Sequence, residues 1–441
     1  MKYQLAIIGG GPAGYTAAEM AGKAGLSVVL FEKNNVGGVC LNEGCIPTKT
    51  LLYVAKVHDT ALHASKYGVN VKEVSADLGK IIARKTKVVR KLVLGIKAKL
   101  TAQKVTLVQG EAYIQDAHTV RCGEELYECE QMIVCTGSAT FIPPVAGLDS
   151  VNYWTHRDAL DNKEIPSSLV IVGGGVIGME FASFFHSLGV KVTVVEMMDE
   201  ILGGMDKELS GLLRADYAKR GVKFLLNTKV TGVTQKEDGI EIEYTCGEEK
   251  NTVCASVGRR PVMSGFGLEN LNLELTARGT VKVDEHLQSS VPGVYVCGDL
   301  NGVSLLAHTA VREAEVAVHH ILGKTDAMSY RAIPGVVYTN PEIASVGCTE
   351  EALTREGRAY RVVSLPAAYS GRFVAENEGV NGVCKVLVGE DEEILGVHLL
   401  GNPASELIIQ AGMMIEDRRK LSDWKKYVFP HPTVGEIFRE L

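Results

Sequence analysis

Two glycine-rich turns, each lying between an apolar run and a helical segment, constrain the fold of this chain more than any other feature. The apolar run 4–8 leads into Gly9-Gly10-Gly11-Pro12-Ala13-Gly14, and the run 169–172 leads into Gly173-Gly174-Gly175-Val176-Ile177-Gly178. Each copy continues through a second apolar run that ends in an acid, Glu32 or Glu196. The first glycine and the acid are 23 positions apart in both copies, a repeat that unrelated glycine turns do not explain.

This pattern of strand, glycine turn, helix, strand and acid is typical of a dinucleotide-binding fold. Gly9 makes the tight turn, Gly11 lets the backbone approach a pyrophosphate at a helix N-terminus, and Gly14 lets the helix pack closely on the sheet. Gly173, Gly175 and Gly178 occupy the same places in the second copy. The sequence therefore predicts an α/β protein that binds two adenine dinucleotides.

The acid of the second copy indicates which nicotinamide cofactor is used. A site for the 2′-phosphate is expected to carry basic residues after the second strand, whereas this chain has Glu196-Met197-Met198-Asp199 there. Because Glu196 would repel the phosphate, the sequence favours NAD(H).

Length and charge narrow the class of protein further. A chain of 441 residues with 46% hydrophobic and 22% charged residues predicts several globular domains. The net charge of -7 excludes an overall basic field that would attract nucleic acid, and the basic residues within 84–99 fit one solvated face of an amphipathic helix. No window approaches 18 apolar residues and no secretory signal opens the chain, so we expect a cytoplasmic protein without a membrane span.

Two cysteines stand five positions apart in a glycine-containing stretch. A regular helix would hold the Cα atoms of Cys40 and Cys45 about 8.7 Å apart, which is too far for a disulfide. Gly44 and Pro47 supply a distortion that can bring the two sulfurs together, because glycine permits unusual backbone angles and proline interrupts the helical hydrogen bonds. We interpret the pair as a redox device.

Two other interpretations of this pair stay open on the residues alone. The cysteines can be separate buried thiols, or they can form half of a zinc site. Zinc is the weaker alternative, because its ligands usually lie closer together and the next cysteine is Cys122. No metal is expected.

Later segments add strands and a separate C-terminal segment. Residues 294–299 form an apolar strand that delivers Asp299 to its end, where open α/β sheets bind ligands. A linker near 329–335 opens a final segment with a hairpin over 385–399 and a helix over 404–416, and without a glycine fingerprint.

Taken together, these motifs resemble the flavoprotein disulfide reductase family, the class I pyridine nucleotide-disulfide oxidoreductases, and within it the dihydrolipoamide dehydrogenases. The similarity covers essentially all 441 positions. The most specific motifs are Cys40 to Lys49, both fingerprints, Thr136-Gly137, Gly298-Asp299, Leu306-Ala307-His308, Thr339-Asn340-Pro341-Glu342 and His431-Pro432-Thr433 with Glu436.

The resemblance implies two Rossmann-like dinucleotide-binding domains and an α+β C-terminal dimerisation domain. We expect an FAD-binding domain over 1–147, an NAD-binding domain over 148–265, a central domain over 266–332 that completes the FAD site, and an interface domain over 333–441.

The resemblance also implies the cofactor sites. The first fingerprint holds FAD, with Glu32 on its ribose, Asp299 on its ribityl chain, and Ala112, Thr136, Gly137 and Ala307 beside it, while the second holds NAD(H). The remaining cofactor-binding candidates are Lys33, Gly38, Val39, Lys49, Ser138, Leu306, His308, Glu180, Val230, Gly258 and Arg259.

Catalytic roles follow from the same resemblance. Cys45 is the charge-transfer thiol nearer the flavin and Cys40 is the interchange thiol, while Lys49 and Glu180 form an ion pair beside the flavin ring. Independently of the resemblance, a helix N-terminus and a nearby lysine both favour the thiolate of Cys45.

A histidine near the C-terminus is the candidate base. The bond between His431 and Pro432 can be cis, and Glu436 lies near enough to orient the imidazole, as a base for thiol deprotonation requires. By the resemblance His431 and Glu436 act on the redox site of the other subunit. The family commonly has another histidine where this chain has Phe429, and only five residues follow Glu436.

The implied activity is oxidation of protein-bound dihydrolipoamide with NAD+ through the cysteine pair and FAD. The expected partners are a second copy of the chain and a lipoyl-bearing protein of a 2-oxo acid dehydrogenase or glycine cleavage complex. The alternatives are a reductase of another small disulfide such as glutathione, which the acidic Glu196 disfavours, or mainly a structural subunit of such a complex.

Overall fold

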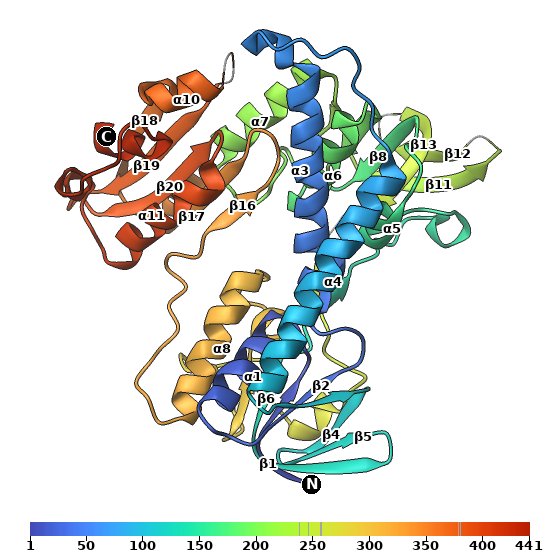
Figure 1. Ribbon diagram of the computed structural model, residues 1–441, viewed down its shortest axis with the longest axis vertical. Helices are drawn as coiled ribbons and strands as arrows, with labels where there is room; N and C mark the ends of the chain where they lie inside the picture. Colours follow the sequence, from blue (N-terminus) through green and yellow to red (C-terminus); the bar gives the residue numbers. More distant parts are fainter. Residues whose placement is uncertain (238, 246, 256–257, 378, 380) are drawn as a thin grey trace. The chain divides into compact units, whose positions relative to one another are not determined.

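The computed structural model describes residues 1–237, 239–245, 247–255, 258–377, 379 and 381–441. The chain folds into two units (Figure 1). Unit 1 consists of Met1–Thr50, Ala83–Phe141 and Arg259–Ser329, and unit 2 of Leu51–Ile82, Ile142–Gly258 and Tyr330–Leu441. The predicted α/β class is confirmed, while the four predicted domain ranges stay predictions.

Unit 1 contains the first fingerprint and the cysteine pair. Its strands are β1 (Lys2–Ile8), β2 (Val28–Glu32), β3 (Thr106–Gln109), β4 (Ala112–Asp116), β5 (Thr119–Cys122), β6 (Glu125–Val134), β7 (Ser138–Thr140), β14 (Arg259–Pro261) and β15 (Val294–Val296). Its helices are α1 (Pro12–Lys23), α2 (Gly38–Glu43), α8 (Ala307–Ile321) and the 3-10 helices η3 (Leu268–Leu271) and η4 (Gly298–Asn301). Both units share α3 (Cys45–Leu62) and α4 (Leu78–Ala102).

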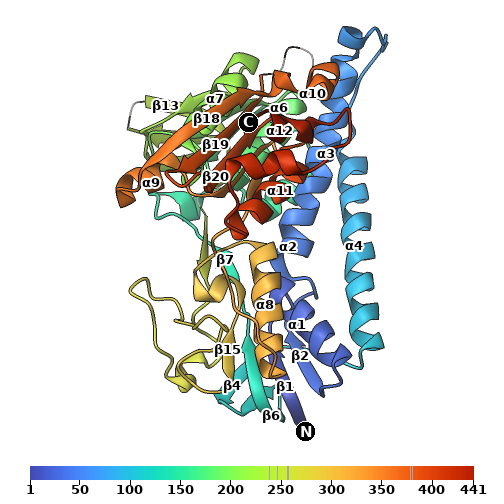
Figure 2. The same ribbon diagram turned by 90° about the vertical axis from the view of Figure 1, so that its left-hand side faces the viewer.

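The main sheet of unit 1 has the strand order β3-β2-β1-β6-β5-β4, and β15 also pairs with β6. Strands β3, β2, β1, β6 and β15 run parallel to their neighbours, whereas β4, β5 and β6 form an antiparallel meander. Helices α1 and α8 lie side by side against this sheet (Figure 2). Leu5, Ala6 and Ile7 of β1 are fully buried, as expected for a parallel strand covered on both faces.

Unit 2 contains the second fingerprint and the C-terminal segment. Its strands are β8 (Ser168–Val172), β9 (Lys191–Val195), β10 (Lys223–Leu225), β11 (Val230–Lys236), β12 (Gly239–Tyr244), β13 (Gly247–Ala255), β16 (Gly335–Val337), β17 (Ile343–Gly347), β18 (Tyr360–Pro366), β19 (Val383–Gly389) and β20 (Ile394–Leu400). Its α-helices are α5 (His156–Asp161), α6 (Val176–Ser187), α7 (Lys207–Arg220), α9 (Glu350–Glu356), α10 (Gly371–Glu376), α11 (Ala404–Glu416) and α12 (Ile437–Glu440). Its 3-10 helices are η1 (Ala64–Tyr67), η2 (Leu148–Ser150), η5 (Ala367–Tyr369), η6 (Leu421–Lys426) and η7 (Val434–Glu436).

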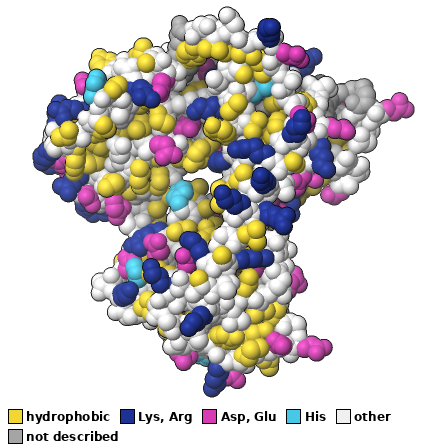
Figure 3. Space-filling view, in the orientation of Figure 1, with side chains coloured by type: hydrophobic (Ala, Val, Ile, Leu, Met, Phe, Trp, Pro, Cys, Tyr) yellow, Lys and Arg dark blue, Asp and Glu magenta, His cyan; other side chains and the backbone are white. Residues whose placement is uncertain are grey.

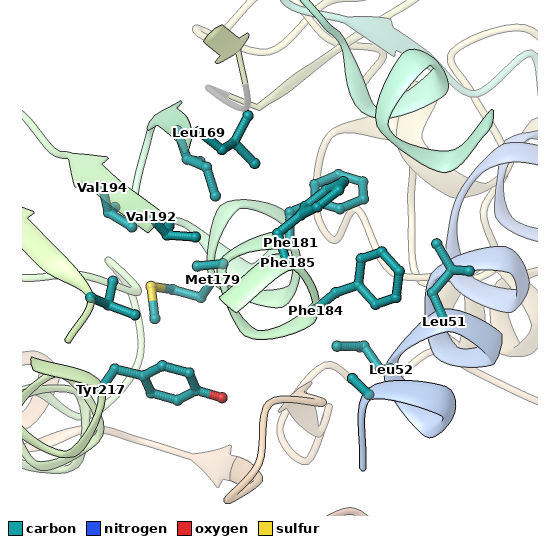
Figure 4. Packing of buried hydrophobic residues seen from close by; sticks show 14 of the residues in the cluster. Leu51, Leu52, Leu169, Met179, Phe181, Phe184, Phe185, Val192, Val194 and Tyr217 are labelled. Atoms are coloured by element: carbon teal, nitrogen blue, oxygen red, sulfur yellow. The ribbon is translucent and has the colours of Figure 1, made fainter. Parts of the chain in front are cut away.

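The first sheet of unit 2 repeats the plan of unit 1. Its order is β10-β9-β8-β13-β12-β11, with four parallel strands followed by an antiparallel meander. Helix α6 packs against it through Met179, Phe181 and Phe185, and Tyr217 of α7 closes the same core (Figure 4). The internal repeat predicted from two glycine turns therefore extends to a whole sheet.

The C-terminal segment forms a separate antiparallel sheet, β16-β17-β20-β19-β18, with α11 packed on it (Figure 1). The predicted hairpin is confirmed as β19 and β20, and the predicted helix 404–416 is α11. Beyond α11 the chain is anchored by Phe438, which is fully buried and whose ring stacks on Trp424 with centroids 4.5 Å apart.

The basic segment forms the exposed side of α4, as expected. Its lysines and arginines gather over this helix on the face shown in Figure 3. Lys85 is an exception and is buried, because it lies on the same helix face as Ile81 and Ile82. Over the part of the chain that the structure describes, no helix combines the length and apolar character that a membrane crossing requires.

Replacing Phe438 by alanine tests the anchoring of the C-terminal segment. We expect Phe438→Ala to lower the free energy of unfolding by about 3–5 kcal/mol, because the substitution leaves a cavity against Trp424. Urea unfolding followed by tryptophan fluorescence measures the loss. The exposed neighbour Glu440 provides the control, and equal losses in Phe438→Ala and Glu440→Ala would contradict the proposed anchor.

Candidate active site

The first glycine turn brings the end of β1 and the start of α1 into direct contact. Gly9 has φ +105°, a conformation that favours glycine, and a Cβ there would lie 2.3 Å from the carbonyl oxygen of Cys135. A Cβ on Gly14 would lie 1.8 Å from the carbonyl oxygen of Gly9. Side chains at these two positions are therefore incompatible with the observed packing of helix on strand.

The second turn repeats this geometry in unit 2. Gly173 also has φ +105°, and a Cβ on Gly178 would lie 2.0 Å from the carbonyl oxygen of Gly173. The backbone dihedral angles at the helix N-caps match as well, with φ -72° and ψ -170° at Gly11 and φ -71° and ψ -177° at Gly175. The two fingerprints are thus the same local structure built twice.

The middle glycine of each turn faces space instead of protein. A Cβ on Gly11 would lie 4.0 Å from the Cα of Gly38, an ordinary van der Waals distance, and a Cβ on Gly175 would meet nothing within 4 Å. Neither α1 nor α6 has a side-chain hydrogen bond at its N-cap. An uncapped helix N-terminus beside open space fits the pyrophosphate of a dinucleotide, so both cradles fit the predicted cofactors.

Each acid at the end of the second strand is fixed by two backbone donors. Glu32 accepts from the N–H groups of Gly10 at 2.8 Å and Asn34 at 2.7 Å. Glu196 accepts from Gly174 at 2.7 Å and Met198 at 2.8 Å. Each carboxylate oxygen has further lone pairs that a ribose hydroxyl could use, and the binding of a ribose by these acids stays a prediction.

The cysteine pair is a disulfide in this structure. Cys40 lies in α2 and Cys45 is the first residue of α3, with the Cα atoms 4.7 Å apart. The helix is interrupted at Gly44, where a Cβ would lie 3.0 Å from the carbonyl oxygen of Val39, and Pro47 occupies the first turn of α3, where its missing N–H is tolerated. The expected distortion is therefore present, and the bond favours the redox interpretation over separate thiols or zinc ligands.

The redox stretch packs against the first cradle. The N–H of Gly37 donates to the carbonyl oxygen of Gly10 at 2.8 Å. Gly38 approaches so closely that a Cβ on it would lie 2.7 Å from the Cα of Gly11. Within unit 1 the stretch that carries the disulfide thus packs directly on the first glycine turn, the predicted pyrophosphate cradle.

The turn that carries Asp299 belongs to the same unit. Ser138 donates a short hydrogen bond from its hydroxyl to Oδ2 of Asp299, and Arg259 donates from Nε to that hydroxyl oxygen at 2.8 Å. Glu313 of α8, fully buried, accepts from the N–H of Gly298 at 2.5 Å. Sequence reasoning missed Glu313, because it stands beside Arg312 and close to Glu315, in a stretch typical of an exposed helix face.

The other predicted cofactor residues of unit 1 lie at or next to the ends of its strands and helices. Thr136 donates from its hydroxyl to the carbonyl oxygen of Val262 at 3.4 Å, and Lys33 is ion-paired with Glu111 at 3.6 Å. Ala112 lines a cavity of about 640 Å³. Gly137 follows β6, and Leu306, Ala307 and His308 form the N-cap and first residues of α8.

The remaining predicted residues lie in unit 2. Val230 begins β11, and its side chain is buried. Gly258 is the last residue of the segment Ile142–Gly258 of unit 2 and has a φ of +115°. Glu180 is buried in α6, where Oε1 accepts from the N–H of Tyr338 at 3.1 Å. The predicted ion pair of Lys49 with Glu180 joins residues of different units and stays a prediction.

The predicted base is oriented as the sequence suggests. The His431–Pro432 bond is cis, Nδ1 of His431 lies 2.9 Å from Oε1 of Glu436, and Oε2 of Glu436 accepts from the N–H of Thr433 at 2.7 Å. The Thr433 N–H and then the His431 ring lower the pKa of Glu436, so it remains a carboxylate and a pure acceptor. The His431 side chain is 82% exposed, which leaves Nε2 accessible from outside.

Comparison with known proteins agrees with this geometry. Residues 3–314 match the family described as pyridine nucleotide-disulphide oxidoreductase, and residues 333–441 match the dimerisation domain of the same family. The chain belongs to the pyridine nucleotide-disulphide oxidoreductase family. It is therefore an oxidoreductase, and the matched dimerisation domain supports a homodimer.

Individual relatives cover the whole chain. It is 36% identical to a dihydrolipoyl dehydrogenase of Geobacillus stearothermophilus, over 100% of this chain and 95% of that protein. It is 37% identical to one of Thermus scotoductus, over 99% of this chain and 96% of that protein. Among solved structures, LpdA from Mycobacterium tuberculosis has a TM-score of 0.91 at 26% identity, covering 99% of both chains. The HOCl-induced flavoprotein disulfide reductase RclA from Escherichia coli has a TM-score of 0.89 at 28% identity, covering 100% and 99%.

In the first fingerprint Gly11 faces open space, whereas Gly14 packs against Gly9, so replacing each of them by alanine gives a matched test. We expect Gly11→Ala to keep the fold but to raise the dissociation constant for FAD about tenfold to a hundredfold, since a methyl group fills the cradle and displaces hydrogen bonds to a charged group. We expect Gly14→Ala to lower the thermal midpoint of the apoprotein, because its Cβ collides with Gly9.

Flavin fluorescence measures the first effect and circular dichroism melting the second. Gly175→Ala provides the same comparison for NAD(H), with a raised KM for NAD+ and unchanged FAD content. Loss of fold in Gly11→Ala, or normal FAD affinity in it, would contradict the assignment of the cradle.

Proposed function

We propose that this protein is a dihydrolipoyl dehydrogenase: it oxidises protein-bound dihydrolipoamide with NAD+. Its cofactors are FAD, held by the first fingerprint, and NAD(H), held by the second. The observation that carries the proposal is the Cys40–Cys45 disulfide, which packs through Gly37 and Gly38 on the first cradle. Full-length relatives named dihydrolipoyl dehydrogenase at 36% and 37% identity support the choice of substrate.

The reaction at the disulfide is a thiol–disulfide exchange. A substrate thiolate forms a bond with Sγ of Cys40 while the Cys40–Cys45 bond breaks, and the electron pair of that bond leaves with Cys45 as a thiolate. The second substrate thiol, once deprotonated, then attacks the substrate sulfur of the mixed disulfide and displaces Cys40. The substrate is oxidised to its cyclic disulfide, the cysteine pair is reduced by two electrons, and two protons are released.

The position of Cys45 suits it to be the leaving thiolate. It is the first residue of the 18-residue helix α3, and a helix N-terminus favours a negative charge. Cys40 lies on the shorter α2, on the other side of the break at Gly44. We therefore assign Cys40 to the substrate and Cys45 to the cofactor side.

His431 of the partner subunit is the proposed base for the substrate thiols. Because ionised Glu436 only accepts, Nδ1 of the imidazole must donate to it, and this places the lone pair on Nε2. A neutral imidazole in this tautomer takes a proton at Nε2 and becomes a cation that Glu436 stabilises. The pair thus holds the base in the correct form before substrate arrives.

The bound cofactors supply the two-electron redox chemistry that returns the cysteine pair to the disulfide. On the protein side, the choice of NAD(H) rests on Glu196, whose carboxylate is fixed by two backbone N–H groups and opposes a 2′-phosphate. Met197 and Met198 follow it, both exposed, and the nearby Lys207 is paired with Asp199 at 2.5 Å. We place the enzyme in the cytoplasm, serving a lipoyl-bearing protein of a 2-oxo acid dehydrogenase or glycine cleavage complex.

The cysteine pair gives the decisive test. We expect Cys40→Ser and Cys45→Ser each to reduce dihydrolipoamide oxidation by roughly a thousandfold or more while FAD stays bound, because the proposed reaction passes the electron pair through both sulfurs. Cys348→Ser, at a free half-buried cysteine, is the control and should keep full turnover.

Steady-state assays of lipoamide and glutathione disulfide, each with NADH and NADPH, separate the proposed substrate from another disulfide. Preference for glutathione disulfide would reject the dehydrogenase. If Cys40→Ser left the function of the protein in its complex unharmed, the chain would serve mainly as a structural subunit.

The base gives a second prediction. We expect His431→Gln to lower kcat/KM for dihydrolipoamide by about 10²–10⁴, the usual contribution of a positioned base. NADH oxidation by an artificial electron acceptor should be unaffected, since it needs no substrate thiol. Glu436→Gln should have a smaller effect in the same direction, and His63→Gln, at an exposed histidine, should have none. Equal activity of His431→Gln and the wild type would remove the proposed base.

A further inference from the structure

A small two-stranded ribbon in unit 1 joins segments that are far apart in the sequence. β7 follows β6 of the main sheet, and β14 is the point where the chain returns to unit 1 after the segment Ile142–Gly258 of unit 2. The strands pair antiparallel, with Arg259 opposite Thr140 and Pro261 opposite Ser138. Arg259 stands one residue after the end of the second nucleotide-binding unit, yet its side chain is part of the first.

Arg259 holds Ser138 through two of its nitrogens. Nε donates to the Ser138 hydroxyl oxygen at 2.8 Å, and Nη2 donates a short hydrogen bond to the Ser138 carbonyl oxygen. Arg259 thus reaches diagonally across the ribbon, two residues along from Thr140, as long side chains do between antiparallel strands. Ser138 itself is 7% exposed, so these bonds are largely shielded from water.

The hydrogen-bond roles at Ser138 have only one solution. A guanidinium group only donates, so the serine oxygen must accept from Arg259. The hydroxyl has one proton, and it is then directed to Oδ2 of Asp299. Arg259 therefore determines the direction of a hydrogen bond that it does not itself make.

Asp299 is fixed on its backbone as well. Glu313 accepts from the N–H of Gly298, and the N–H of Gly302 donates to the carbonyl oxygen of Asp299 at 3.1 Å. With its backbone held from both sides and Oδ2 held by Ser138, the Asp299 side chain has one set orientation. These bonds do not use Oδ1, which as a carboxylate oxygen can accept from a ligand hydroxyl.

We propose that Arg259 is a positioning residue of the FAD site, acting through Ser138 on Asp299, and not a residue of the NAD(H) site. The identity of the ligand as FAD rests on the proposed function. Arg259 orders the hydroxyl of Ser138 before the ligand arrives, so its loss weakens FAD binding by releasing Asp299. Ser138 and Arg259 work as a unit, and removing either one removes the same effect.

The neighbour Arg260 gives a matched control for this proposal. Its guanidinium lies over the Phe141 ring, 3.8 Å from the centroid, on the next position of the same short strand. Arg260→Met removes an equal charge from the same ribbon without touching Ser138. We compare it with Arg259→Met, Arg259→Lys, Ser138→Ala and the double variant Arg259→Met/Ser138→Ala.

The readout is the dissociation constant of FAD, measured by flavin fluorescence on stripped and reconstituted protein. We expect Arg259→Met and Ser138→Ala each to raise this dissociation constant about tenfold to a hundredfold. Because residues that act as a unit have non-additive effects, the double variant should bind FAD no more weakly than the single variant with the lower FAD affinity. The FAD dissociation constant of Arg259→Lys should lie between those of the wild type and Arg259→Met, because lysine keeps the charge but lacks the planar set of donors of arginine. The KM for NAD+ of reloaded enzyme should be unchanged in all of them.

Several outcomes would overturn the proposal. These are wild-type FAD affinity in Arg259→Met, additive losses in the double variant, an equal loss in Arg260→Met, or a raised KM for NAD+ with normal FAD affinity. If Arg259→Met does not fold, Ser138→Ala and Arg259→Lys decide the question by the same measurement. A wild type that binds FAD but does not oxidise dihydrolipoamide would reject the proposed function and leave the role of Arg259 intact.

Discussion

The contact between a helix and the turn that precedes it is the constraint on which this structure depends. Gly14 lies against the carbonyl oxygen of Gly9, and Gly178 lies against that of Gly173, so closely that no side chain fits at either glycine. This contact points the N-terminus of α1 or α6 at the open space next to Gly11 or Gly175. It also places the start of each helix at the carboxyl end of a parallel sheet, where the fixed acids Glu32 and Glu196 stand. The two cofactor cradles are therefore consequences of packing and not of loops alone.

The redox pair depends on the first of these cradles. Gly37 and Gly38 bring the start of α2 against the turn at Gly10 and Gly11, which fixes where the disulfide lies in unit 1. The break at Gly44 then separates the two cysteines onto two helices. A regular helix would keep the sulfurs apart, and a flexible loop would not fix their direction. An interrupted helix meets both requirements with only a glycine and a proline.

Much of this was predictable from the sequence because it depends on local rules. The spacing of glycines and acids specified two strand–turn–helix units, and two runs of residues on either side of the turn 389–393 specified the hairpin β19–β20. The position of Pro47 after Cys45 indicated the helix break. Each of these features is set by backbone geometry within a segment of about 25 residues, and at that range the residue types and their spacing are enough to predict the local structure.

Contacts between segments that are distant in sequence could not be predicted in this way. Nothing near Arg259 in the sequence indicates that its partner is Ser138, because the chain passes through the whole second nucleotide-binding sheet between them. Glu313 shows the same problem, since its partner Gly298 is defined only once α8 has packed on the sheet. Lys85 was assigned to a solvated helix face, and its burial follows from the helix rotation that Ile81 and Ile82 impose.

A buried ion cluster shows what such distant contacts contribute. Lys385 of β19 is fully buried and lies 2.9 Å from a carboxylate oxygen of Asp206 and 2.7 Å from one of Glu208, with Glu350 also in contact. Burial lowers the pKa of the lysine, but the hydrogen bonds that it donates to Glu208, Glu350 and Asp206 raise the pKa above its ordinary value. A buried charge is tolerated only when its partners are present. Because Asp206 caps α7 of the second nucleotide-binding fold while Lys385 belongs to the C-terminal sheet, the cluster ties these two parts into one unit. The C-terminal segment, which also contains His431 and Glu436, is thereby held to the fold that carries the second fingerprint, within a single subunit.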